Sequence, residues 1–314
     1  MATMGLEDVA DIVWSQCIDA KPDEKALIAS DASGERLEIG EALLKTGKQI
    51  CKCRLMKMKP TGMPGTEPTP EVAKAMLKAD IVIAPTKNSL THTMAADNAA
   101  KQGARVTTMP GITKDIFLRT IPLDYNGIDA VNTKLKEILL NSRKLRVTTA
   151  AGTDIAMEIV EGRTIVNGNG IAMKGKIVNL PCGEVYFAPR EAKSNGTVVF
   201  DLSALNKKLA KPFRVEVKDG HAVSCEHREL WKILTAAENG TNLAELGIGT
   251  NPKAKVTGNI LEDEKVRGTA HIAFGTNAPF GGTVQTSVHL DSIFSKPTIE
   301  ADGKTIISEG RFLF

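Results

Sequence analysis

The stretch A-D-I-V-I-A-P-T, residues 79–86, decides the fold class of this chain. Its short apolar run ends at a proline and precedes a segment with helical spacing at residues 91–102, so it predicts a buried strand followed by a helix. The same order occurs twice before it, with strands expected at residues 24–31 and 53–58 and helices near 34–48 and 71–78. Repeated pairs of this kind imply a parallel sheet with helices on its faces.

From about Leu145 the pattern changes to short apolar strands separated by glycine turns. Examples are residues 145–163, 196–201 and 213–225. Such closely spaced signals indicate a mainly antiparallel region, here with a helix at residues 226–238. A chain of 314 residues is long enough for two cores. We therefore expect a parallel-sheet α/β domain at residues 1–143, followed by a β-rich α+β metal-binding domain at residues 144–314.

Composition excludes several classes of protein. The net charge is only +3, acids and bases are interspersed and aromatic residues make up 4%, which disfavours a nucleic-acid binder. No stretch of about 18 apolar residues predicts a membrane span. The five cysteines form no C-x-x-C pair and are expected to be reduced thiols, which with a charged N-terminal segment predicts a cytoplasmic protein. No glycine-rich nucleotide motif follows the predicted strands.

Metal-ligand chemistry is suggested by T-S-V-H-L-D-S-I, residues 286–293. In an extended segment His289 and Asp291 point to the same side, so an imidazole and a carboxylate share one face. The alternative is a surface histidine beside an aspartate that caps a turn.

Three further side chains of the second half could join this pair. Glu184 follows the turn P-C-G, Glu245 interrupts an apolar segment that we expect to break at Gly247 and Gly249, and His271 lies in a short apolar strand. Buried carboxylates need a partner, and a shared cation would supply one. Each residue also has an ordinary interpretation: Glu184 as a turn cap, Glu245 on a helix surface, and His271 as a core histidine bonded to a carbonyl.

The order of several motifs resembles the metallo-aminopeptidase family of the aminopeptidase T type. The motifs are P-C-G-E-V-Y-F-A-P, L-A-E-L-G-I-G-T-N-P, D-E-K-V-R-G-T-A-H-I-A-F-G and V-H-L-D, with A-D-I-V-I-A-P-T-K-N-S-L-T-H-T in the first half. The resemblance implies a metal-dependent hydrolase that releases N-terminal residues from peptides by means of a water activated by two metal ions, Zn, Co or Mn.

The resemblance also implies roles for individual residues. The metal ligands would be Glu184, Glu245, His271, His289 and Asp291. Either glutamate would also act as the bridging or general-base carboxylate. Glu264 and Asp263 are candidates to orient the ligating histidines, or are surface charges.

One departure from the aminopeptidase pattern opens an alternative. Ala278 stands where those enzymes have a tyrosine, seven residues after His271. The related 2,5-dihydroxypyridine dioxygenases would use His271, His289 and Asp291 to hold one Fe(II), with the two glutamates as acid/base or substrate-orienting groups. Retention of both glutamates favours the hydrolase, which is the predicted function. A relative that binds metal without turnover is a third hypothesis.

The expected partners are a small peptide or other small molecule and a second copy of the chain in a homodimer, with no nucleic acid and no membrane. His92 follows the strongest predicted strand and is a weak candidate for substrate binding. A helix beginning there would leave open backbone N–H groups that favour an anion. The alternative is a simple helix cap formed by Ser89 or Thr91.

Overall fold

The computed structural model describes residues 4–314 and divides them into two compact units. The first unit contains residues 4–125 and 169–182, and the second contains residues 126–168 and 183–314. This division differs from the expected boundary after residue 143. Helix α6 (Tyr125–Leu140) joins the second unit because Leu135 and Leu139 are part of its apolar core.

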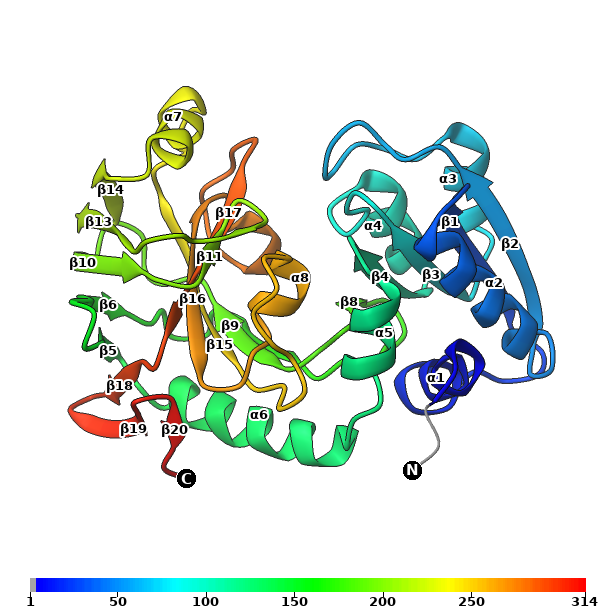
Figure 1. Cartoon of the computed structure of the whole chain (residues 1–314), viewed down its shortest axis with the longest axis horizontal. Helices are drawn as coiled ribbons and strands as arrows, with labels where there is room; N and C mark the ends of the chain where they lie inside the picture. Colours follow the sequence, from blue (N-terminus) through cyan, green and yellow to red (C-terminus); the bar gives the residue numbers. More distant parts are fainter. Residues whose placement is uncertain (1–3) are drawn as a thin grey trace. The chain divides into compact units, whose positions relative to one another are not determined.

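The first unit is built on a parallel sheet with the strand order β2-β1-β3-β4-β8 (Figure 1). The strands are β1 (Lys25–Asp31), β2 (Lys52–Met58), β3 (Ile81–Thr86), β4 (Arg105–Pro110) and β8 (Ile177–Asn179). The predicted parallel α/β domain is therefore confirmed. The sequence pattern did not predict β8. This strand pairs with β4 in the first sheet, although residues 126–168, which precede it, belong to the second unit.

Helices cover both faces of this sheet. The apolar sides of α3 and α4 pack on residues such as Leu27, Val82 and Val106, while α2 contacts β1, β2 and β3 and packs on α1. The bounds are α1 (Leu6–Ile12), the π-helix η1 (Val13–Ile18), α2 (Glu35–Gly47), α3 (Pro70–Met76), α4 (Met94–Lys101) and α5 (Lys114–Thr120).

The second unit contains two antiparallel sheets with an apolar core, which confirms the predicted β-rich half. The first has the order β14-β13-β10-β6-β5-β18-β19-β20. Its strands are β5 (Lys144–Thr148), β6 (Asp154–Glu158), β10 (Asn195–Phe200), β13 (Phe213–Lys218), β14 (His221–Cys225), β18 (Thr298–Ala301), β19 (Lys304–Ser308) and β20 (Arg311–Phe312).

The second sheet has the order β12-β11-β17-β16-β15-β9-β7. Its strands are β7 (Ile165–Gly168), β9 (Glu184–Phe187), β11 (Ser203–Ala204), β12 (Lys207–Lys208), β15 (Leu243–Gly249), β16 (Thr269–Gly275) and β17 (His289–Ser295). Short helices complete the unit: α7 (Arg228–Ala236), α8 (Ile260–Asp263) and the 3₁₀ helix η2 (Ala278–Phe280). Within residues 4–314, no helix has both the length and the apolar character that crossing a bilayer requires.

Candidate metal centre

The seven-stranded sheet has one face in the core and one face that carries the predicted site residues. Leu246 and Ile272 belong to the apolar core. Their neighbours Glu245 and His271 point to the opposite face because side chains alternate along a strand. Because side chains alternate along each strand, one face of the sheet is apolar and the other carries buried polar side chains.

Small residues on this face make room for the functional side chains. Gly247 pairs with His271 across β15 and β16, and a Cβ at position 247 would stand 2.1 Å from the imidazole. Ala273 pairs with both Glu245 and Asp291 and separates these two carboxylates. Strand β15 ends at Gly249, as expected, but the expected break at Gly247 is wrong. Gly247 lies within the strand, where it provides space for His271.

All five residues predicted from the sequence come together on this face. His271 Nε2 lies 3.1 Å from Glu245 Oε1 and 3.8 Å from Glu184 Oε2. His289 Nε2 lies 3.4 Å from Glu245 Oε2 and 3.6 Å from Asp291 Oδ1. Glu245, His271 and Asp291 each offer one ligand atom, and these atoms lie within 4.8 Å of one another. The spacing of these nitrogen and oxygen donors is suited to a divalent cation.

The pKa shifts within the cluster show that its carboxylates stabilise a nearby positive charge. Burial lowers the pKa of His271, but the hydrogen bond with Glu245 and the charges of Glu245 and Asp291 raise it to about 9. Burial also opposes protonation of His289, yet Asp291 and Glu245 raise its pKa well above the usual range. Glu245 responds in the opposite sense, because hydrogen bonds from both histidines outweigh its burial and lower its pKa.

Three atoms of the cluster are arranged as ligand donors would be. His289 Nδ1 lies 2.8 Å from the carbonyl oxygen of Thr276 and must donate to it, which leaves Nε2 as the ring nitrogen that faces Glu245 and Asp291. Buried Oδ1 of Asp291 and Oε2 of Glu184 make no hydrogen bond to any residue in the described range 4–314. Buried oxygens without a hydrogen-bond partner, beside an imidazole nitrogen that a bound cation would keep unprotonated, fit a metal site.

A buried lysine that the sequence interpretation did not include occupies one side of the cluster. Lys265 Nζ lies 2.8 Å from Glu184 Oε1 and also contacts Glu264, and its side chain is 1% exposed. Burial disfavours the charged amine, but these two carboxylates raise the pKa of Lys265. Burial and the charges of Glu184 and Asp291 raise the pKa of Glu264 to about 8, against the lowering effect of Lys265. Lys265 stands in the quoted motif D-E-K-V, but its burial could not be read from the sequence.

The two candidates for orienting the histidines, Glu264 and Asp263, have different surroundings in the structure. Glu264 belongs to the cluster, with a carboxylate oxygen within 4.8 Å of ligand atoms of Glu184 and His271. Asp263 instead accepts backbone N–H groups of Thr257 at 2.6 Å and Gly258 at 2.9 Å, so it orders the loop before α8.

Two aromatic residues extend the site face beyond the cluster. Tyr186 lies two residues after Glu184 on β9, and burial together with the charge of Glu245 raises its pKa well above the usual range. Phe280 makes edge-to-face contacts with Tyr186 at 5.6 Å and with the imidazole of His289 at 5.8 Å, measured between ring centroids. Ala278 starts the exposed turn that carries Phe280. The motif P-C-G-E-V-Y-F contained Tyr186, and the i, i+2 rule that linked His289 to Asp291 would also have found it.

His92 lies in the first unit, and its expected surroundings need one correction. The cap of α4 is Thr93, whose side chain accepts the N–H of Ala96, and neither Ser89 nor Thr91 caps this helix. The open N–H groups of Met94 and Ala95 bind the carboxylate of Glu67 at 2.6 and 3.1 Å. The anion that we expected at these N–H groups is thus the carboxylate of Glu67. His92 itself is exposed at the turn.

The chain thus combines a parallel α/β unit with an antiparallel unit that carries a face of histidines and carboxylates. The family model for 2,5-dihydroxypyridine 5,6-dioxygenase matches residues 20–314, and the chain belongs to this family. A search of curated proteins found no match.

Two solved structures share this fold at 17% sequence identity. The 2,5-dihydroxypyridine dioxygenase from Pseudomonas putida KT2440 has a TM-score of 0.83, with 100% of this chain and 98% of that chain covered. Wild-type AmpT from Thermus thermophilus has a TM-score of 0.73, with 98% of this chain and 99% of that chain covered.

Proposed function

We propose that this protein is a mononuclear non-haem iron dioxygenase that opens a dihydroxylated aromatic ring. The observation that carries the proposal is the position of Lys265. Its ammonium binds Glu184, the carboxylate that a second metal ion would need. Two cations competing for one buried carboxylate repel each other strongly. This charge distribution favours one ion. We assign as its ligands His271 and Asp291, which offer ligand atoms within 4.8 Å of each other, and His289, which lies 3.6 Å from Asp291. This proposal replaces the hydrolase as our preferred function, and family membership supports the change.

The metal ion and the side chains around it would have different roles in the reaction. Fe(II) held by two imidazoles and one carboxylate supplies the redox chemistry that makes dioxygen reactive toward an electron-rich ring. Both oxygen atoms enter the product as a ring carbon–carbon bond breaks, so the overall reaction consumes no separate reductant.

The surrounding side chains would bind the ring and move its protons. Tyr186 and Phe280 present aromatic surface beside His289, which favours a flat ring over an extended peptide. Glu245, hydrogen-bonded to His271, is the carboxylate that we assign to accept a proton from a ring hydroxyl. Glu264 contacts Lys265 and lies beside Glu184 and His271, so it belongs to the charged surroundings of the site. Glu184 orients Lys265 in this proposal and is not a ligand.

The decisive experiment combines a metal count with two activity assays. Protein purified without air and supplied with Fe(II) is expected to hold one iron per chain and to consume oxygen with 2,5-dihydroxypyridine. His289→Ala should lose the iron, whereas Glu184→Gln should keep it and lose only turnover. Two Zn, Co or Mn ions per chain with release of leucine from leucyl amide, and a fall toward one ion in Glu184→Gln, would establish the aminopeptidase instead. Bound metal with neither activity would identify an inactive relative.

We also propose that His92 contacts the substrate. It lies between β3 and α4, and ligands of open α/β sheets bind beyond the carboxyl ends of the strands. His92→Ala should raise KM for the ring substrate and leave the iron content unchanged. Unchanged kinetics on a confirmed substrate would refute the proposal.

A further inference from the structure

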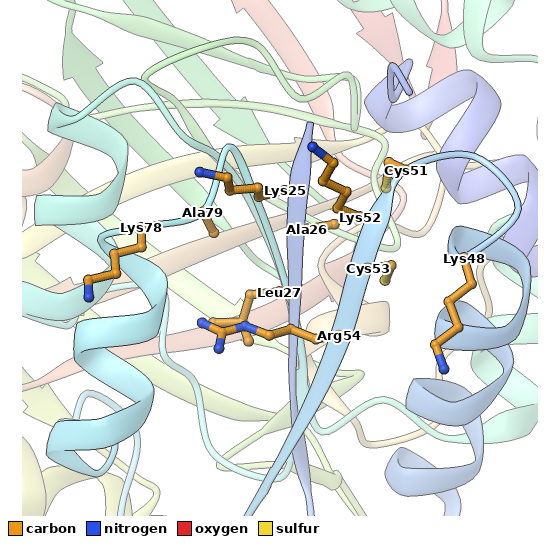
Figure 2. Close-up of a pocket in the computed structure, with 10 residues that line it drawn as sticks. All are labelled: Lys25, Ala26, Leu27, Lys48, Cys51, Lys52, Cys53, Arg54, Lys78 and Ala79. Carbon is orange, nitrogen blue, oxygen red and sulfur yellow. The ribbon is translucent and has the colours of Figure 1, made fainter. Parts of the chain in front are cut away.

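A second polar feature lies within the first unit, at the amino ends of β1 and β2. It is a hollow of about 570 Å³ between these strands and the segments that follow α2 and α3 (Figure 2). Among the ten residues that line it are five cationic side chains and no acidic one. The cationic residues are Lys25, Lys48, Lys52, Arg54 and Lys78.

The geometry of the two strands concentrates this charge on one side. Lys25 and Lys52 are register partners in the parallel β1–β2 pair, and neighbouring strands lie only about 4.8 Å apart. Figure 2 shows Lys52 and Arg54 leaving β2 toward the side on which Lys25 and Lys78 lie. Strand alternation has the same result, because positions 52 and 54 share a face. Like charges placed side by side across strands are destabilising unless something compensates them.

Other lysines on β2 and α2 form ion pairs with acidic side chains, unlike the cations of the hollow. On β2, Lys57 pairs with Glu41 at 2.9 Å, and on α2, Lys45 pairs with Glu7 at 2.6 Å. In the described range 4–314, none of the five cations in the hollow forms an ion pair with another residue.

Two acidic residues adjoin the hollow in sequence, Glu24 and Asp80. Glu24, beside Lys25 in sequence, forms an ion pair with Arg105. Asp80 Oδ2 accepts the backbone N–H of Lys25 at 2.8 Å. Asp80 keeps its negative charge, while Glu24 is already balanced by Arg105. Five cations in the lining thus exceed the acids beside them, and the hollow has a net positive charge.

We propose that this basic hollow is a binding site for a phosphorylated small molecule. Four cations that share one side match a polyvalent anion, whereas a single carboxylate would balance only one of them. Arg54 can bind two phosphate oxygens at once through its planar guanidinium, and the lysines add point charges. The floor of Ala26, Leu27 and Ala79 offers no aromatic surface, so recognition rests on the phosphate groups.

Inorganic pyrophosphate is the probe for the test, with the full-length protein titrated by calorimetry and by thermal unfolding. We expect saturable binding and a rise in Tm that sodium chloride of equal ionic strength does not reproduce. The double variant Lys52→Gln/Arg54→Gln should bind at least tenfold more weakly. Lys57→Gln, a change to a paired lysine on the same strand, should bind like the parent protein.

Two further measurements exclude other causes. Without pyrophosphate, the double variant should unfold at the same or a higher temperature than the parent, since it removes repulsion; this separates lost binding from misfolding. His289→Ala should keep the response, which separates the hollow from any metal that pyrophosphate might chelate. An equal response in the parent and the double variant would overturn the proposal. So would binding of duplex DNA or of anionic phospholipid vesicles without binding of pyrophosphate.

Discussion

Gly247 and His271 face each other across β15 and β16 so closely that a methyl group on residue 247 would stand 2.1 Å from the imidazole ring. The ring is rigid and its neighbours are buried, so it has little room to move. The position of a central candidate ligand thus depends on the absence of a side chain on the next strand.

Gly247→Ala is therefore expected to displace His271 and weaken metal binding. Overpacking of this kind typically costs about 1 to 3 kcal/mol in the free energy of unfolding. Metal titration and urea unfolding measure the two effects. Gly62→Ala is the matched control, because nothing lies within 4 Å of a Cβ at that position. Unchanged metal affinity in Gly247→Ala would show that the imidazole is not a ligand.

Lys265→Met should destabilise the protein strongly, since it leaves the buried carboxylates of Glu184 and Glu264 without their cation. Removal of one partner from a buried ion pair usually costs about 3 to 5 kcal/mol. Urea unfolding of metal-free protein provides the measurement. Lys45→Met, which breaks the exposed pair with Glu7, should have a much smaller effect. Equal effects of the two substitutions would contradict the role assigned to Lys265.

Glu191 makes the loop that carries Phe280 sensitive to acid. Its carboxylate binds Arg163 at 2.8 Å, the side chain of Asn277 at 3.0 Å and the N–H of Thr283 at 2.9 Å. Burial raises the pKa of Glu191, but the bond from Arg163 and the backbone N–H groups lower it from 4.5 to about 2.

A lowered pKa stabilises the folded state above the unfolded value, and this contribution is lost as the pH falls from 4.5 toward 2. Glu191→Gln should therefore lose less stability than the parent protein over that interval, and differ most from it near neutral pH. Unfolding curves at pH 6 and pH 3 test the difference. Parallel losses in both proteins would show that Glu191 does not contribute.

Thr93→Ala should cost about 1 kcal/mol in the free energy of unfolding, because Thr93 caps α4 through the N–H of Ala96. Ser89→Ala serves as the comparison, since Ser89 bonds Thr91 and not the helix. If Ser89→Ala proved the more harmful change, the helix would begin earlier than the structure shows.

Local patterns were sufficient to predict much of this protein. The apolar run at residues 81–86 and the helical spacing after it predicted the parallel sheet, because burial on both faces of a strand leaves a continuous apolar stretch. The glycine-spaced strands after Leu145 predicted the antiparallel half, and the i, i+2 spacing of His289 and Asp291 predicted their shared face. These features depend on neighbours in the chain, so the sequence alone determined them.

Other features were decided only by contacts between distant segments. Strand β8 returns to the first sheet because it hydrogen-bonds to β4, some 70 residues earlier, and no local pattern specifies that partner. Gly247 looked like a strand end, but the ring of His271 on the next strand explains its lack of a side chain. The sequence interpretation gave Lys265 no role, and only the fold placed its ammonium on Glu184. The sequence could predict which histidines and carboxylates gather on one face. Whether that face favours one cation or two depends in our proposal on where this buried ammonium lies, because charge repulsion acts through space and not along the chain.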